Sequence, residues 1–191
     1  MSKTPFSWMR RALSVAVVTF TMGCGDEIPA GPDAALLATL HTNKRDPDLS
    51  ACQNLRAPAG SKLAFHTFAT GVQIYRWNGT SWSFVAPEAV LTEDAGGNGV
   101  VGTHYAGPTW ESNSGSKVVG ALVDRCTPNP NAIPWLLLRA VSNDGPGIFQ
   151  RVTSIQRVNT VGGLAPATSG TVVGEEARVP YTTEYFFYRL K

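Results

Sequence analysis

Four residues with chemically useful side chains lie close together in the segment GTHYAGPTWE, residues 102–111: His104, Tyr105, Trp110 and Glu111. An imidazole and a carboxylate are the minimum for general acid–base catalysis, and they could also supply two ligands of a metal site. The aromatic rings could instead form a platform for a sugar or another flat ligand. The third interpretation is a strand and a turn in which these residues are structural.

A second polar pair, Arg157 and Asn159, stands among β-branched residues in the segment IQRVNT. A buried arginine without partners is energetically costly. The structural alternative for this pair is therefore hydrogen bonding to a neighbouring loop. Together with the four residues above, these two complete the set of candidate ligand-binding residues.

The sequence lacks the established catalytic and metal-binding motifs. It contains no G-x-S-x-G, no H-E-x-x-H and no P-loop, and its three histidines, at positions 41, 66 and 104, do not have the spacing of a catalytic triad. Nothing in the spacing selects further ligands to join His104 and Glu111. We therefore expect no metal and no cofactor.

The segment GNGVVG, residues 97–102, has the G-x-G-x-x-G spacing of a dinucleotide-binding turn, and Asp124 follows about twenty residues later. That turn requires a strand before it and a helix after it. Pro108 lies too close to allow the helix. We predict a loop between strands and no nicotinamide cofactor.

The elements that must position these residues are short β-rich segments from residue 62 onward, separated by turn residues. The chain has 19 Gly and 13 Pro, and no amphipathic helical stretch of a dozen residues stands out. We predict a single all-β domain over residues 58–191. Its expected fold is an antiparallel β-sandwich or barrel, jelly-roll-like, with little helix.

The segment VQIYRWNGTSWSFV predicts a tight hairpin, because the Asn-Gly pair at 78–79 suits a two-residue type I′ turn. In that register Tyr75 lies opposite Trp82, and Gln73 lies opposite Phe84. Buried aromatic residues dominate the packing of small β domains. We expect this aromatic face to belong to the core rather than to a ligand surface.

In the segment GTHYAGPTWE, a strand is expected to end at Tyr105, the chain to turn at residues 106–108, and Trp110 to enter the next strand. Neighbouring side chains on a strand point to opposite faces. Trp110, with the largest apolar surface, is expected to be buried and Glu111 to face outward or into a groove. On this interpretation, replacing His104 or Glu111 changes ligand binding or activity and hardly changes stability.

The N-terminal 23 residues have the layout of a secretory signal peptide: basic residues, an apolar run and then small residues. The apolar run of about 11 residues is too short to span a bilayer, which takes roughly 18–20. The following Cys24 fits a lipidation site, although the residues before it depart from the usual lipobox. We expect an exported protein of the cell envelope, lipid-anchored at the outer membrane or secreted, with residues 24–57 as a tether and no other membrane contact.

Removal of the signal peptide takes away three of the 16 Lys and Arg residues and none of the 14 Asp and Glu residues, leaving 13 − 14 = −1. No basic cluster remains, so we expect no nucleic-acid partner. If Cys24 is acylated, Cys52 and Cys126 remain as an even pair in an oxidising compartment, and we predict a disulfide between them. Two free thiols are the alternative.

Six motifs occur in order between Pro58 and Tyr188: GVQIYRW, WSFVAPEAVL, HYAGPTWE with SGSKVVG, IPWLLLRA, VTSIQRVNTVGGLAP and VPYTTEYFFY. In this order they resemble the domain of unknown function 3455 family of secreted bacterial and fungal proteins. The resemblance implies an extracytoplasmic β domain without an assigned activity. Relatives often carry cysteines where this chain has Trp77 and near Gly170, and both cysteines are absent here.

Two classes of function follow from these observations. The first is a non-catalytic domain that binds a glycan, a small molecule or a protein. The second is an uncharacterised hydrolase or lyase using His104, Tyr105 and Glu111. A concave pocket that also gathers Trp110 and Arg157 would favour the enzyme, and an open aromatic face would favour binding. We favour the binding domain, because no catalytic constellation has a specific spacing.

Overall fold

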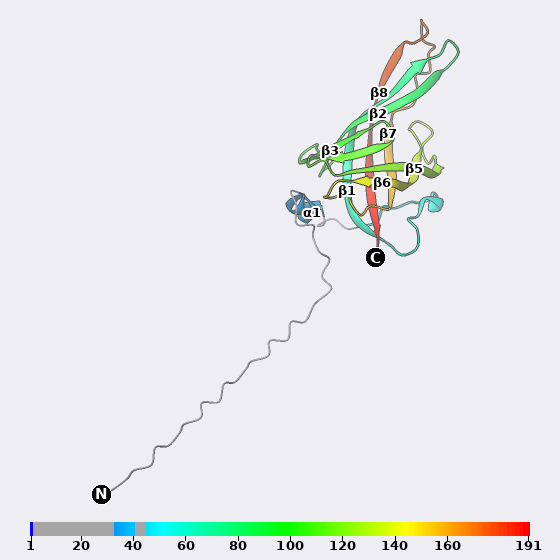
Figure 1. Ribbon diagram of the computed structural model, residues 1–191. Helices are drawn as coiled ribbons and strands as arrows, with labels where there is room; N and C mark the ends of the chain where they lie inside the picture. The colour runs from blue at the N-terminus through cyan, green and yellow to red at the C-terminus, as the bar shows by residue number, and fades with distance from the viewer. Residues whose placement is uncertain (2–32, 41–44) are drawn as a thin grey trace.

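Eight antiparallel strands form a closed barrel in the computed structural model, which describes Met1 and residues 33–40 and 45–191 (Figure 1). The strands are β1 (Ser61–Trp77), β2 (Trp82–Thr92), β3 (Val100–Tyr105), β4 (Thr109–Ser112), β5 (Lys117–Cys126), β6 (Trp135–Asp144), β7 (Ser154–Gly162) and β8 (Glu176–Leu190). The predicted all-β barrel is thus confirmed. The remainder of the predicted signal peptide, and Cys24, lie outside the described residues.

The strand order is a simple up-and-down meander: each strand pairs with the next, and β8 closes the ring on β1. The jelly-roll-like connectivity expected from the sequence is therefore wrong, because a jelly roll needs strands that cross to non-adjacent neighbours. Residues 97–99 lie in the loop between β2 and β3, as predicted for the segment 97–102, whereas residues 100–102 already belong to β3. The end of β1 and the starts of β2 and β8 extend beyond the other strands (Figure 1).

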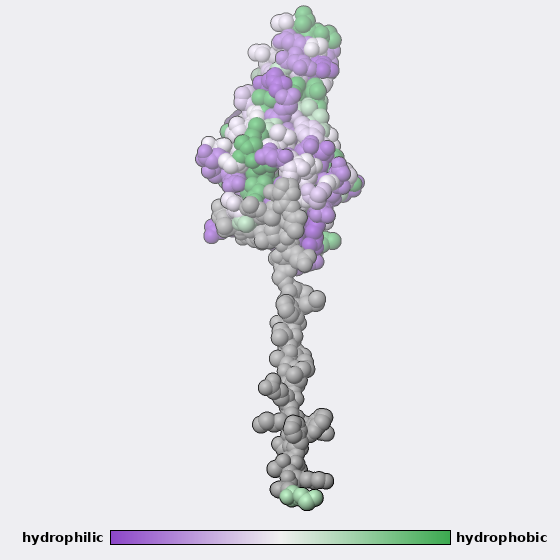
Figure 2. Space-filling model, turned by 60° about the vertical axis from the view of Figure 1, so that its left-hand side comes forward, coloured by the Kyte–Doolittle hydropathy of each residue, from purple (hydrophilic) through white to green (hydrophobic). Residues whose placement is uncertain are grey.

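The main core fills the barrel, and it follows from the alternation of side chains along each strand. In β8, Tyr181, Tyr185 and Phe187 point inward and are at most 2% exposed. The alternate residues Phe186 and Tyr188 point outward, yet they are also buried, in a second cluster. On the face shown in Figure 2, hydrophobic residues form a narrow band and a patch at the tip among hydrophilic ones.

The second cluster lies beneath residues 45–57, which contain the short 3-10 helix η2 (Gln53–Leu55). Leu49 and Leu55 are buried there, and Cys52 forms a disulfide with Cys126 at the end of β5, as predicted. Closing a loop of this length is worth roughly 4 kcal/mol on the chain-entropy model. This part of the expected tether is therefore packed onto the barrel.

The helix α1 (Ala34–Leu40) also contacts the barrel, and Leu40 belongs to the main core. Asp33 precedes it and is buried; its carboxylate accepts hydrogen bonds from the backbone N–H of Ile148 and from the hydroxyl of Ser112. Among the described helices, none has the length and apolar character that crossing a bilayer requires.

The β1–β2 hairpin forms, but its predicted register is wrong. Trp77 pairs with Trp82, and Tyr75 pairs with Phe84. The reason lies in Asn78, whose side-chain oxygen accepts the backbone N–H groups of residues 80 and 81. This local bond opens the connection to four residues, where the Asn-Gly motif favours two.

Candidate functional site

The β3–β4 hairpin divides the four polar and aromatic residues of GTHYAGPTWE between the two faces of the sheet. His104 pairs with Trp110, and both side chains point into the barrel, where they are 3% and 1% exposed. Tyr105 and Glu111 lie on the outer face. The predicted burial of Trp110 is confirmed, and the constellation of His104, Tyr105 and Glu111 is not brought together.

His104 and Trp110 form one wall of the barrel interior. Their rings stack at a centroid distance of 4.4 Å, and the edge of Tyr185 meets both rings, at 5.2 Å and 5.3 Å. Gly120 makes room for this wall, because a Cβ atom there would lie 3.0 Å from the Trp110 ring. The wall is thus built from the β3–β4 hairpin and from β8, which is distant from it in the sequence.

The imidazole of His104 is neutral in this setting. Its Nδ1 lies 2.8 Å from the carbonyl oxygen of Thr109 and must donate to it, which leaves Nε2 with the lone pair. Burial lowers the pKa of His104 to about 3; the nearby charge of Arg157 adds to this, and the bond to Thr109 opposes it. The expectation that His104 hardly affects stability is therefore wrong, because the ring is part of the core.

Arg157 reaches the same region from β7, where it pairs with Tyr185 of β8 and Leu136 of β6. Its Nε and Nη2 donate to the carbonyl oxygen of Pro134, at 3.2 Å and 2.8 Å. The predicted hydrogen bonding to a neighbouring loop is thus present. Among the carboxylates that the structure describes, none forms an ion pair with Arg157.

A cavity of about 220 Å³ opens between these groups. It gathers His104, Trp110 and Arg157, and it adds Tyr185, which was not among the residues expected from the sequence. The alternation in YTTEYFFY could have placed Tyr185 on an inner face, but it could not show which strand faces it. The other lining residues are almost all apolar: Phe84, Val85, Pro87, Gly107, Pro108, Leu122, Leu136 and Leu138.

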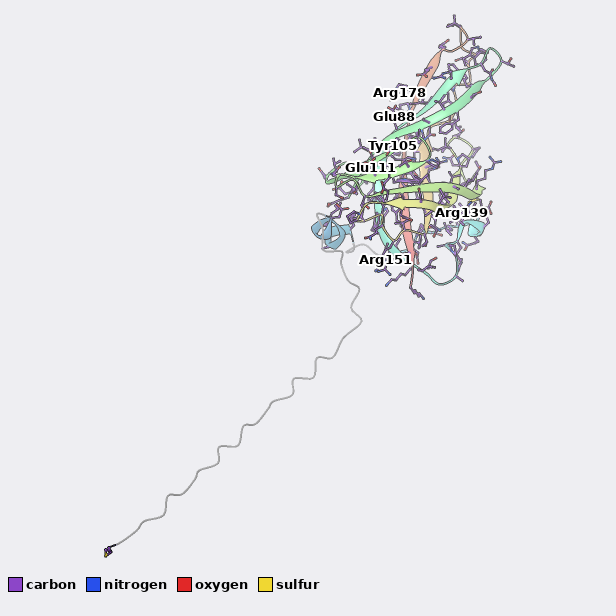
Figure 3. The ribbon with its side chains drawn as sticks, in the orientation of Figure 1. Glu88, Tyr105, Glu111, Arg139, Arg151 and Arg178 are labelled. Carbon is purple, nitrogen blue, oxygen red and sulfur yellow. A yellow bond between two sulfur atoms is a disulfide. The ribbon has the colours of Figure 1, made fainter. Side chains whose placement is uncertain are left out.

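On the outer face, Tyr105 donates a hydrogen bond of 2.5 Å to Glu111, and Lys117 lies 3.6 Å from the same carboxylate oxygen. This hydrogen bond is the main reason that the pKa of Tyr105 rises to about 12. Farther along the same side lies the ion pair between Glu88 and Arg178 (Figure 3). These pairs follow the outside of the sheet and do not line the cavity.

Asn159 is also separated from Arg157, although their positions in the chain differ by only two. A β-bulge between Val158 and Val161 holds Asn159 at a φ of 52°, in the left-handed region. Its side chain is exposed and donates to Glu184, whose other oxygen lies 2.8 Å from Nε2 of His66. Asn159 therefore belongs to an outer polar cluster and not to the cavity.

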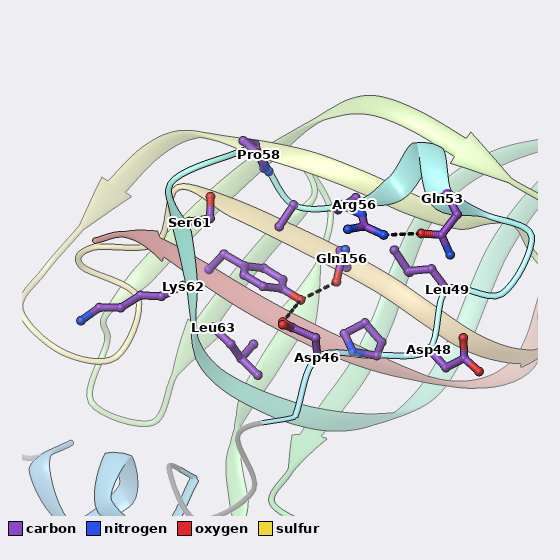
Figure 4. A pocket seen from close by; sticks show the side chains of 13 residues that line it. Asp46, Asp48, Leu49, Gln53, Arg56, Pro58, Ser61, Lys62, Leu63 and Gln156 are labelled. Carbon is purple, nitrogen blue, oxygen red and sulfur yellow. Dashed lines mark hydrogen bonds between the residues drawn. The ribbon is translucent and has the colours of Figure 1, made fainter.

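A second cavity, of about 380 Å³, lies beneath residues 45–57 (Figure 4). The hydroxyl of Tyr188 lies 2.9 Å from Asp46 and 2.8 Å from the side-chain oxygen of Gln156, and the amide of Gln156 donates to the carbonyl of Leu55. This network ties the N-terminal segment to β7 and β8. Its groups are engaged with one another, which indicates a structural role.

Within residues 33–40 and 45–191, no group of three or more His, Cys, Asp or Glu side chains is placed to hold a metal ion. A family model described as "Protein of unknown function (DUF3455)" matches residues 58–189. Comparison with curated proteins and with solved structures found no match.

Proposed function

The chain belongs to the DUF3455 family of proteins of unknown function. On this premise, we propose that the protein is exported and lipid-anchored, and that its barrel binds a small molecule. The observation that carries the proposal is the cavity between His104, Trp110, Arg157 and Tyr185. Binding sites for small molecules are typically concave and apolar, with a few polar groups at fixed positions. This cavity has that composition.

The character of the cavity favours a small molecule over a glycan or a protein. A sugar needs many paired hydrogen-bonding groups, whereas most of the lining here is aliphatic or aromatic. A volume of about 220 Å³ suits one or two fused rings or a short chain. The open aromatic platform considered from the sequence is absent from the described GTHYAGPTWE segment, because Trp110 is buried.

The alternative of a hydrolase or lyase using His104, Tyr105 and Glu111 has less support. His104 lies inside the barrel, and the other two side chains lie outside. In addition, a neutral imidazole with a pKa of about 3 is a weak base at neutral pH. Binding without catalysis therefore fits the geometry better.

Blocking the mouth of the cavity tests the binding proposal. Leu122 and Val123 are neighbours on β5 and are 54% and 55% exposed, but only Leu122 lines the cavity. In isothermal titration calorimetry, we expect the wild type and Val123→Trp to bind both 2-naphthalenemethanol and 2-naphthoate. Leu122→Trp is expected to bind both compounds at least about 10-fold more weakly than the wild type does. Absence of binding to the wild type, or equal binding by the two variants, would contradict the proposal.

Export and anchoring rest on the N-terminal sequence, in which basic, apolar and small residues precede Cys24. Metabolic labelling with a fatty acid is expected to mark the wild type and not Cys24→Ala. Equal labelling of both would remove the lipid anchor from the proposal and leave the binding site unaffected.

A further inference from the structure

We propose that the ligand of this cavity carries a carboxylate on an apolar body, and that Arg157 receives the carboxylate. This inference rests on the proposed function, since it names the class of small molecule that the cavity binds. Its basis is the guanidinium of Arg157, which lines the cavity without an ion-pair partner among the described carboxylates, together with the buried donors of two other lining residues, Trp110 and Tyr185.

Arg157 is the first of these donors. The bonds from Nε and Nη2 to Pro134 fix the plane of the guanidinium, and the side chain also lies within hydrogen-bonding reach of the Tyr185 hydroxyl. The side chain is half-buried and lines the cavity without an ion-pair partner among the described carboxylates. Removing a cation from water without a counterion is costly, and a ligand carboxylate would compensate for that cost.

Two further donors line the same cavity. The indole N–H of Trp110 is buried and has no hydrogen-bond partner among the described residues, and the buried hydroxyl of Tyr185 lies within hydrogen-bonding reach of Tyr181 and Arg157. An indole N–H can only donate. The pKa of Tyr185 is raised well above its usual value, chiefly by burial, so this hydroxyl stays protonated and can donate as well. A ligand that supplies acceptor oxygens would pair with both groups.

Buried polar groups continue beyond the cavity lining. The hydroxyl of Tyr181 and the side-chain amide of Gln73 are also buried, and they lie within hydrogen-bonding reach of each other. Tyr181 lies close enough to Tyr185 and Arg157 for its pKa to respond to both, although burial is the larger influence and raises it. Tyr181 and Gln73 do not line the cavity, but they extend the buried polar groups that adjoin Tyr185 and Arg157.

The charge of the lining limits which anion fits. Among the described residues, Arg157 is the only Lys or Arg that lines the cavity, and His104 is neutral. One positive charge matches a monoanion, whereas a phosphate dianion would leave a negative charge unpaired in apolar surroundings. The planar guanidinium also suits the two oxygens of a carboxylate. The aliphatic residues Leu122, Leu136 and Leu138 would surround the apolar part of the ligand.

A matched pair of compounds tests this inference: 2-naphthoate carries the carboxylate, and 2-naphthalenemethanol has the same rings without the charge. In calorimetry the wild type is expected to bind 2-naphthoate at least about 10-fold more tightly. Arg157→Met is expected to lose the preference for 2-naphthoate while it still binds 2-naphthalenemethanol. The control Arg139→Met makes the same change at an exposed position on β6, away from the cavity (Figure 3), and is expected to keep the preference.

Tyr185→Phe keeps the ring and removes the hydroxyl. It provides a second test of the inference if Arg157→Met does not fold. It is expected to weaken 2-naphthoate about 3- to 10-fold and to leave the alcohol unchanged. Equal affinity of the wild type for both compounds, a preference that persists in Arg157→Met, or a preference that is undiminished in Tyr185→Phe would overturn the carboxylate inference alone. If neither compound binds the wild type, the proposed function fails with it.

Discussion

The buried imidazole of His104 makes the stability of the barrel depend on pH. The unfolded chain takes up a proton on this histidine near pH 6.5, and the folded protein resists protonation down to about pH 3. Because the unfolded state binds more protons between these values, stability falls as the pH decreases through this window. We expect a loss of about 2–3 kcal/mol between pH 7 and pH 4.5 in urea unfolding.

The control for this expectation is His104→Phe, which keeps an aromatic ring against Trp110 and removes the titrating group. Its unfolding free energy is expected to change less over the same window, and the difference between the two proteins isolates His104 from the carboxylates. The same decline in both proteins would show that His104 is not the group responsible.

At the level of single residues, sequence reasoning succeeded where size alone decides. Trp110 has the largest apolar surface in its segment, and it is buried as predicted. The inward position of His104 depends on its pairing with Trp110, because paired residues share a face. The separation of Asn159 from Arg157 depends on a β-bulge, and no residue type near position 159 indicates an extra residue in the strand.

At the level of elements, the β1–β2 hairpin contacts the loop before β8 at Trp77 and Gly170, at or near the positions where the family resemblance implies cysteines in relatives. A Cβ atom at Gly170 would lie 2.8 Å from Cβ of Trp77, and the indole of Trp82 donates to the carbonyl of Thr168 in the same loop. We expect the double variant Trp77→Cys, Gly170→Cys to form a disulfide after a small shift of the loop. Non-reducing peptide mapping would detect it.

Two free thiols at positions 77 and 170 in the oxidised double variant would contradict this contact. The hairpin itself was predictable, because two β-rich runs flank an Asn-Gly pair. Its register was not, since Asn78 bonds to the backbone two and three residues later and lengthens the turn. Because the loop is two residues longer than expected, Tyr75 pairs with Phe84 instead of Trp82, and Trp82 pairs with Trp77.

At the level of the whole molecule, the all-β class and the pairing of Cys52 with Cys126 followed from composition and from the number of cysteines. The closure of β8 on β1 did not, because strand neighbours are not encoded in any local segment. The cavity could not be predicted for the same reason. Its lining comes from β2, the β3–β4 hairpin and β5 to β8, and only the closed ring brings these residues together.

The central claim, that a small acid binds inside the barrel, is tested most directly by the indole N–H resonance of Trp110 during titration with 2-naphthoate. Trp110→Phe identifies that resonance in ¹H–¹⁵N spectra. We expect it to shift as its unpaired N–H gains an acceptor, while the resonances of Trp82 and Trp135, which do not line the cavity, stay in place. A shift at Trp82 or Trp135 with none at Trp110 would contradict binding inside the barrel.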